Sequence, residues 1–180
     1  DAGDAAVYSR VRHVSLNAYS KTMRNVRAIS DRLVATGSKC LFGAGYVITR
    51  ENWQHLADGV EALRDAGVGY VRLTAMFSKE HESYYNGLDR SIPDQIQQAK
   101  ELETDSFKVI DLYGTRIKDL KQRAPDYDMC GYQFFTTFIG ADLKVYRCCS
   151  TAYTNAGEIG DLNGQRFSDF FGLPAMTQTH

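Results

Sequence analysis

Apolar and polar residues follow one another in short blocks along the chain, and the clearest block lies between residues 40 and 77. Its first part, residues 41–49, is an apolar run rich in Gly and β-branched residues and too short for a helix, so it predicts a buried strand. Asn52 then caps a stretch in which apolar side chains recur at helical spacing: Leu56, Val60 and Leu63, with Gly67 as the stop. Residues 70–77 form a second apolar run, which predicts a second strand.

The order strand, helix, strand predicts a βαβ unit whose strands are parallel, because the connection between them is helical. Amphipathic patterns predict one helix that starts at Ser15 or Ser20 and runs to Gly37, and another at 92–104, the second opened by a capping box of Ser91 with Asp94. The apolar face of the first of these helices consists of Met23, Val26, Ile29 and Leu33. Shorter patterns predict three further elements: a helical turn at 6–14, a strand at 107–113 and a short helix at 115–122.

The pattern changes in the last third of the chain, where aromatic residues and Thr replace the helical spacing. Residues 132–139 and 144–148 read as two strands around a turn at Gly140, and together they predict a β-hairpin. The predicted fold class is therefore α/β, with a small, hairpin-containing α+β extension at the C-terminal side.

Composition is that of a soluble globular protein, with 43% hydrophobic and 24% charged residues. A net charge of −1 argues against a dedicated nucleic-acid or membrane-surface protein. No apolar run approaches the length of about 18 residues that a spanning helix needs. We therefore expect no nucleic-acid or membrane partner and a cytoplasmic location. The chain opens with DAGDAAVY rather than with Met, and we expect a fragment of a longer protein.

Four cysteines are too few for a disulfide scaffold in a chain of 180 residues. Cys40 stands at the start of the first predicted strand, and we expect it in the core. The predicted hairpin folds its ends together, so Cys130 should lie close to Cys148 and Cys149. This clustering favours a metal site over a disulfide, with three small buried apolar residues as the alternative. Side chains alternate faces along a strand, so the two adjacent cysteines cannot both point the same way in an extended chain.

A polar loop with the sequence SKEHESYYNG follows the second predicted strand. In α/β proteins, ligand-handling groups lie after the C-terminal ends of parallel strands. Glu80, His81 and Glu82 are therefore candidates for acid–base chemistry, and Tyr84 and Tyr85 for lining a substrate. The alternative for all five residues is a plain solvent-exposed loop.

The order of these segments resembles the C-terminal part of a radical S-adenosylmethionine (SAM) enzyme with a SPASM or Twitch extension. Residues 1–3 are similar to the end of the family's fourth barrel strand, GAGYVITREN to the fifth strand and its loop, and AGVGYVRLTAMFS to the sixth strand. Cys130, IGADLKVYRCC and IGDLNGQRFSDFF resemble the region of the auxiliary iron–sulfur cluster. Two departures stand out. Leu143 replaces the family's turn glycine, and the C-x-x-x-C-x-x-C loop that binds the catalytic [4Fe-4S] cluster is not in this chain.

The resemblance implies a partial (β/α) barrel over residues 1–104 and a SPASM/Twitch-like extension over residues 105–180. It also implies a radical SAM enzyme, which reductively cleaves SAM to a 5′-deoxyadenosyl radical that abstracts hydrogen from its substrate. Peptide or natural-product modification is the expected context, with a small molecule or peptide as substrate and an external electron donor as partner. Without the catalytic-cluster cysteines, this chain alone is not expected to be active, and no catalytic residue is assigned.

The resemblance also implies site residues. The edge of the SAM pocket is expected at four positions, with Asp1 near the ribose and Phe77 or its neighbour Met76 near the adenine: Asp1, Gly45, Val47 and Phe77. An auxiliary Fe–S cluster is expected at Cys130 and Cys148, with Cys149 as the less certain ligand, because Cys148 matches the family's V-Y-x-C pattern.

Two other functions remain open. The chain is alternatively part of a non-radical (β/α)-barrel enzyme that uses a carboxylate and His81. It is alternatively a binding module in which Cys130, Cys148 and Cys149 hold a structural zinc ion, although the paired C-x-x-C knuckles typical of such sites are missing.

Overall fold

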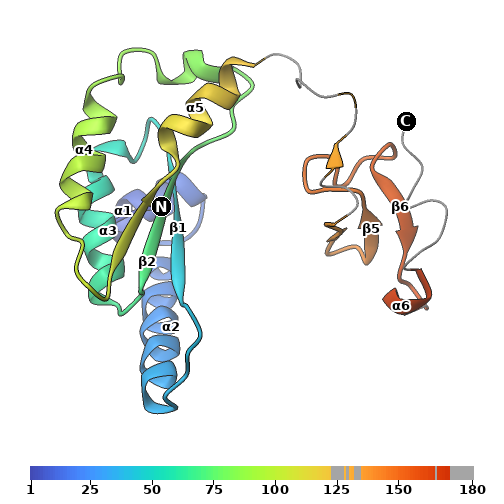
Figure 1. Cartoon of the computed structure of the whole chain (residues 1–180), viewed down its shortest axis with the longest axis horizontal. Helices are drawn as coiled ribbons and strands as arrows, with labels where there is room; N and C mark the ends of the chain where they lie inside the picture. The colour runs from blue at the N-terminus through green and yellow to red at the C-terminus, as the bar shows by residue number, and fades with distance from the viewer. Residues whose placement is uncertain (123–127, 129, 132–134, 165, 171–180) are drawn as a thin grey trace. The chain divides into compact units, whose positions relative to one another are not determined.

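A computed structural model describes residues 1–122, 128, 130–131, 135–164 and 166–170 (Figure 1). The chain divides into two compact units, Asp1–Arg123 and Ala124–His180. In the described residues, each unit contains one three-stranded sheet, and neither sheet closes into a barrel. The predicted α/β class with a hairpin-containing extension is confirmed at this level, whereas the barrel is not established.

The first unit alternates helices and strands. Its elements are α1 (Ala5–Arg12), α2 (Leu16–Ala35), β1 (Gly43–Ile48), the 3-10 helix η1 (Trp53–His55), α3 (Leu56–Asp65), β2 (Tyr70–Ala75), the 3-10 helix η2 (His81–Tyr85), α4 (Ser91–Lys100), β3 (Lys108–Asp111) and α5 (Tyr113–Lys121). The sheet order is β1-β2-β3, and both pairs of strands are parallel. This confirms the predicted βαβ unit. Because β3 pairs with β2, residues after 104 belong with the first unit, and the units do not divide at the predicted boundary.

One face of the first sheet supplies much of the core. On β1, Tyr46 and Ile48 are fully buried, and on β2, Val71 and Leu73 are fully buried. They form one hydrophobic cluster with apolar residues of α3 and α4, and the half-buried Trp53 of η1 packs against that cluster. The intervening residues, such as Gly45, are more accessible. The sheet is therefore packed with helices on the face that carries its large apolar side chains.

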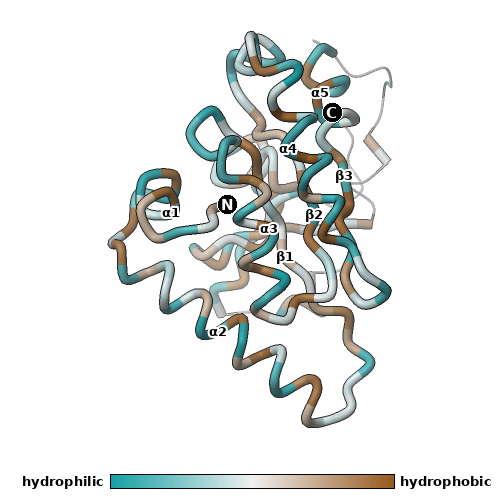
Figure 2. The backbone as a smooth tube through the Cα atoms, turned by 90° about the vertical axis from the view of Figure 1, so that its left-hand side faces the viewer, coloured by the Kyte–Doolittle hydropathy of each residue, from teal (hydrophilic) through white to brown (hydrophobic). Residues whose placement is uncertain are grey.

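Helix α2 confirms the predicted amphipathic helix but uses less of its apolar face than expected. Figure 2 shows hydrophilic and hydrophobic residues mixed along its length. Met23 is buried and Val26 half-buried, whereas Ile29 is 46% exposed. Among the described residues, no helix combines the length and apolar character needed to cross a membrane.

Three local predictions in the first unit are wrong. Cys40, expected in the core, is exposed, since strand pairing starts at Gly43, which is opposite Tyr70. The capping box does not form, because Arg90 is the N-cap of α4 and Ser91 is already helical. Asn52 precedes η1 but makes no capping hydrogen bond with its side chain.

The second unit is a small antiparallel sheet. It contains β4 (Phe138–Ile139), β5 (Lys144–Tyr146), β6 (Glu158–Asp161) and the short helix α6 (Phe167–Phe170). Antiparallel pairing of β4 with β5 confirms the predicted hairpin, and β6 adds a strand that was not predicted. Part of the predicted strand at 132–139 lies outside the described residues. Leu143 adopts a φ of 63° in the turn, a left-handed conformation that costs a non-glycine residue roughly 1–2 kcal/mol.

Candidate functional site

The N-terminal end of the described chain is tied to β1 by a buried asparagine. The Asn52 side chain is fully buried and donates from Nδ2 to the carbonyl oxygens of Asp1 and Val47, both at 2.9 Å. Its Oδ1 accepts a hydrogen bond from the Thr49 amide at 2.7 Å. One side chain thus joins residues 1, 47 and 49, and it holds Asp1 beside the C-terminal half of β1.

The carboxylate of Asp1 is fixed by two further contacts. Its Oδ1 accepts a hydrogen bond from the Val47 amide at 2.8 Å, and its Oδ2 lies 3.3 Å from Nε of Arg12 on α1. The Asp1 side chain is 10% exposed, and that of Arg12 is 57% exposed. The ion pair with Arg12 is therefore partly exposed to solvent, whereas the hydrogen bond from Val47 is sheltered from it.

A cavity of about 180 Å³ opens next to this carboxylate, between β1 and the first two helices. Asp1, Tyr8, Arg12, Tyr19 and Gly45 contribute to its lining. A side chain at Gly45 would meet no atom within 4 Å, so this residue leaves open space against the strand. The Tyr19 hydroxyl donates to the Gly3 carbonyl at 2.6 Å, and burial raises the pKa of this phenol. Tyr19 is therefore uncharged at neutral pH, and its hydrogen bond to Gly3 holds it in place in the lining of the cavity.

Three of the four predicted SAM-site residues meet here. Asp1 and Gly45 line the cavity, and Val47 is bonded to Asp1 through its amide. Phe77 does not line the cavity; the residue is 71% exposed, and the centroid of its ring lies 4.9 Å from the guanidinium carbon of Arg116 on α5. Arg12, Tyr19 and Asn52 complete the site without having been predicted for it. Arg12 pairs with Asp1, Tyr19 with Gly3, and Asn52 with Asp1 as well as with the nearby Val47 and Thr49, and the contacts with residues 1 and 3 follow no local spacing pattern.

The three cysteines of the second unit differ in exposure. Cys130 and Cys148 are half-buried and Cys149 is exposed. Within the described residues, no group of three or more His, Cys, Asp or Glu side chains is placed to hold a metal ion. The ladder pairs Phe138 with Tyr146, so continuing its register by two residues would set Cys148 opposite position 136 rather than opposite Cys130. Residues 129 and 132–134, which flank Cys130, lie outside the described residues, so the closeness of these two sulfurs stays a prediction.

The thiol of Cys148 nevertheless has a distinct environment. Its Sγ lies 3.5 Å from the Thr151 hydroxyl, and this hydrogen bond is the main cause of a lowered pKa for the thiol. A lowered pKa favours the thiolate, which is the form that binds metals.

The two tyrosines after β2 have structural partners. The Tyr85 hydroxyl donates to the Ile48 carbonyl at 2.7 Å and accepts from the Met76 amide at 2.6 Å, so it joins the ends of β1 and β2. The Tyr84 hydroxyl accepts from the Arg50 amide at 3.1 Å, and the Arg50 guanidinium lies over the Tyr84 ring. His81 lies at the start of η2 with a φ of 55°. This loop is held in place by its own aromatic residues.

Comparison of the chain with protein-family models and with curated proteins finds no match. The family resemblance therefore rests on the sequence segments alone. The structural evidence on function consists of the fold of the first unit and the cavity beside Asp1.

Proposed function

We propose that the first unit is a ligand-binding α/β domain whose site lies beside the C-terminal half of β1. More specifically, we propose that it forms part of the SAM-binding region of a radical SAM enzyme. The single observation that carries this proposal is the convergence of Asp1, Gly45 and Val47, which the sequence resemblance selects independently of the structure. Residues 1 and 45–47 are far apart in the chain, so their meeting is not a consequence of local geometry.

The site suits one part of SAM rather than the whole molecule. Pockets that enclose complete small-molecule ligands usually measure about 300–1,000 Å³, and this cavity measures about 180 Å³. Each carboxylate oxygen can accept more than one hydrogen bond, so Asp1 keeps acceptor capacity for a ribose diol in addition to its contacts with Val47 and Arg12. Gly45 allows a ligand to approach the strand backbone closely.

The chemistry of the whole enzyme would belong to its cofactors. When bound, SAM and a catalytic [4Fe-4S] cluster would supply radical hydrogen abstraction from a small-molecule or peptide substrate, with the electron coming from an external donor. In this proposal, Asp1 orients the ribose, and Asn52 and Arg12 hold Asp1 in place. The expected auxiliary cluster at Cys130, Cys148 and Cys149 stays a separate proposal for the second unit, and these cysteines have no role in the proposed SAM site.

The proposal is tested by SAM binding to this chain, followed through backbone amide shifts in ¹⁵N-labelled protein. We expect the amides of Gly45 and Val47 to shift as SAM is added at millimolar concentration. Asp1→Asn should weaken binding about tenfold, because it replaces a charge-assisted hydrogen bond with a neutral one. The matched control is Asp31→Asn, which alters an exposed carboxylate on α2. Unmoved Gly45 and Val47 amides, or equal affinity of both variants, would overturn the proposal and leave a non-radical α/β enzyme as the better hypothesis.

A further inference from the structure

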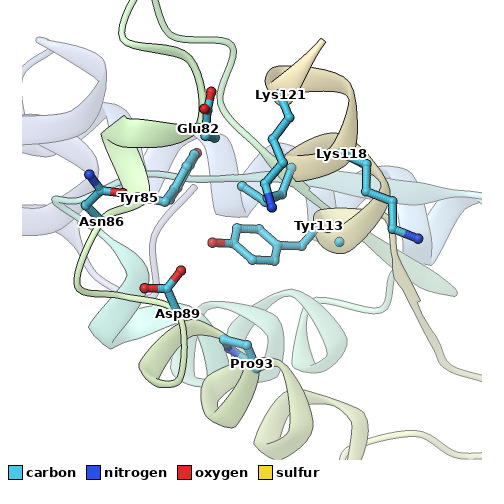
Figure 3. Close-up of a pocket in the computed structure, with 10 residues that line it drawn as sticks. Glu82, Tyr85, Asn86, Asp89, Pro93, Tyr113, Lys118 and Lys121 are labelled. Atoms are coloured by element: carbon cyan, nitrogen blue, oxygen red, sulfur yellow. The ribbon is translucent and has the colours of Figure 1, made fainter.

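A second and larger cavity lies between η2, the start of α4, and α5 (Figure 3). Its volume of about 450 Å³ falls within the range of about 300–1,000 Å³ in which pockets enclose small-molecule ligands. The elements that form it follow the C-terminal ends of β2 and β3, the position where open parallel sheets bind ligands. It shares no lining residue with the cavity beside Asp1.

Tyr113 is the central residue of this cavity. As the first residue of α5 it is only 8% exposed, and its ring packs edge-on against the ring of Tyr85 at 5.5 Å. Figure 3 shows its hydroxyl pointing away from α5 and into the cavity. The hydroxyl is not sealed inside the protein, because it is open to the cavity. An accessible hydroxyl at the wall of a cavity is able to bond a ligand, so Tyr113 offers a polar contact there.

The Tyr113 hydroxyl is a donor at neutral pH. Burial, and next the nearby carboxylate of Asp89, raise the pKa of this phenol to about 12. Protonated Tyr113 can therefore donate to an acceptor, or accept from an ammonium group through its oxygen lone pairs.

Charges of opposite sign face this hydroxyl from two elements. In Figure 3, the Asp89 carboxylate points toward Tyr113 from the segment before α4, and the Lys121 ammonium reaches over the Tyr113 ring from α5. Lys118 also belongs to the lining, but its ammonium extends away from the ring. Glu82 and Asn86 also belong to the lining, and Pro93 and Ile117 supply apolar wall.

We propose that this cavity binds a small zwitterion of the α-amino-acid class. Its ammonium group pairs with Asp89 and the Tyr113 oxygen, its carboxylate pairs with Lys121, and its apolar side chain lies against Pro93 and Ile117. The lining carries charges of both signs, with Asp89 and Glu82 against Lys118 and Lys121, so complementarity favours a ligand that carries both charges. This inference does not depend on the proposed binding of SAM beside Asp1.

The experiment uses L-leucine as the probe, titrated into the ¹⁵N-labelled chain. We expect the amides of Gly114 and Asn86, which line the cavity, to shift. L-Leucinamide, which lacks the carboxylate, and N-acetyl-L-leucine, which lacks the ammonium, should each bind at least tenfold more weakly. If both derivatives bind as tightly as leucine, or if leucine causes no shift, the proposal is overturned.

Two substitutions test the assigned groups without threatening the fold. Tyr113→Phe keeps the ring that packs on Tyr85 and removes only the hydroxyl, and we expect it to weaken leucine binding about fivefold or more. Lys121→Met should have a similar effect on leucine and none on L-leucinamide. The matched control is Lys118→Met, on the same helix with its ammonium directed away, which should leave the affinity unchanged. Equal affinities of Tyr113→Phe and the unaltered chain would contradict the proposal. Shifts at Gly114 and at Gly45 report on the two cavities separately, so either proposal can fail alone.

Discussion

At the scale of single residues, Asn52 is the side chain on which the candidate site most depends. It is fully buried and makes three hydrogen bonds to backbone groups of Asp1, Val47 and Thr49. We predict that Asn52→Ala lowers the free energy of unfolding by about 3 kcal/mol, because buried backbone groups left without a partner cost about 1–3 kcal/mol each. Urea denaturation followed by circular dichroism measures this loss.

Asn86→Ala is the control for this prediction, because Asn86 is exposed. It should change the free energy of unfolding by less than about 0.5 kcal/mol. A loss below about 1 kcal/mol for Asn52→Ala would contradict the prediction, because it would mean that water takes the place of the amide group and bonds the backbone groups of Asp1, Val47 and Thr49.

The role of Asn52 also shows why part of the site could not be read from the sequence. An asparagine between a strand and a helix is a good capping residue, and local pattern supports no other function. Its actual partners include the carbonyl of Asp1, which precedes it by 51 positions. Such a contact follows from tertiary packing alone. Asp1, Gly45 and Val47 could be selected only through the family resemblance, and Arg12 and Tyr19 not at all.

At the scale of elements, the approach of α3 to β1 depends on a glycine. A side-chain carbon at Gly59 would lie 2.5 Å from Cε2 of Tyr46 and 3.2 Å from the Ala2 carbonyl carbon. We predict that Gly59→Ala lowers the free energy of unfolding by about 2 kcal/mol, because overpacking a filled core costs about 1–3 kcal/mol. Thermal unfolding of the variant measures this effect.

A matched substitution separates packing from helix propensity. Gly114 lies within α5, and a side chain there would meet no atom within 4 Å. Gly114→Ala should therefore raise stability, by up to about 1 kcal/mol, through its better helix propensity. If both alanine variants stabilise the protein, the close contact between α3 and Tyr46 is not rigid enough to resist a methyl group.

The elements themselves were largely predictable, and the exceptions have a common cause. Short apolar runs identified β1 and β2, and helical spacing of apolar residues identified α3. It placed the first strand too early, since Leu41 is apolar yet 87% exposed and lies before the first paired residue, Gly43. β6 was missed because its identity as a strand depends on pairing with β5. In both cases the extent of the strand depends on the neighbouring strand with which it pairs, and a local sequence pattern does not contain that information.

At the scale of the whole molecule, the large hydrophobic cluster belongs to the first unit, with members from Met23 to Leu120. We predict that residues 1–122 alone unfold cooperatively on heating. Truncation after residue 104, the boundary suggested by the sequence, should abolish this transition. It removes four buried members of the cluster: Phe107, Val109, Tyr113 and Leu120. Circular dichroism and amide dispersion compare the two pieces, and an equally stable piece ending at 104 would show that β3 and α5 are dispensable.

The position of Trp53 gives this protein an internal optical probe. It is the single tryptophan of the chain and packs, half-buried, against the core of the first unit. The aromatic residues described in the second unit are Phe and Tyr, as in the cluster of Phe138, Tyr146 and Tyr153. Selectively excited indole fluorescence therefore reports the unfolding of the first unit alone, because the described aromatic residues of the second unit do not contribute to it. Trp53 directly follows Asn52, which binds Asp1 and Val47. A ligand that changes these contacts should therefore change the Trp53 fluorescence, and no added label is needed.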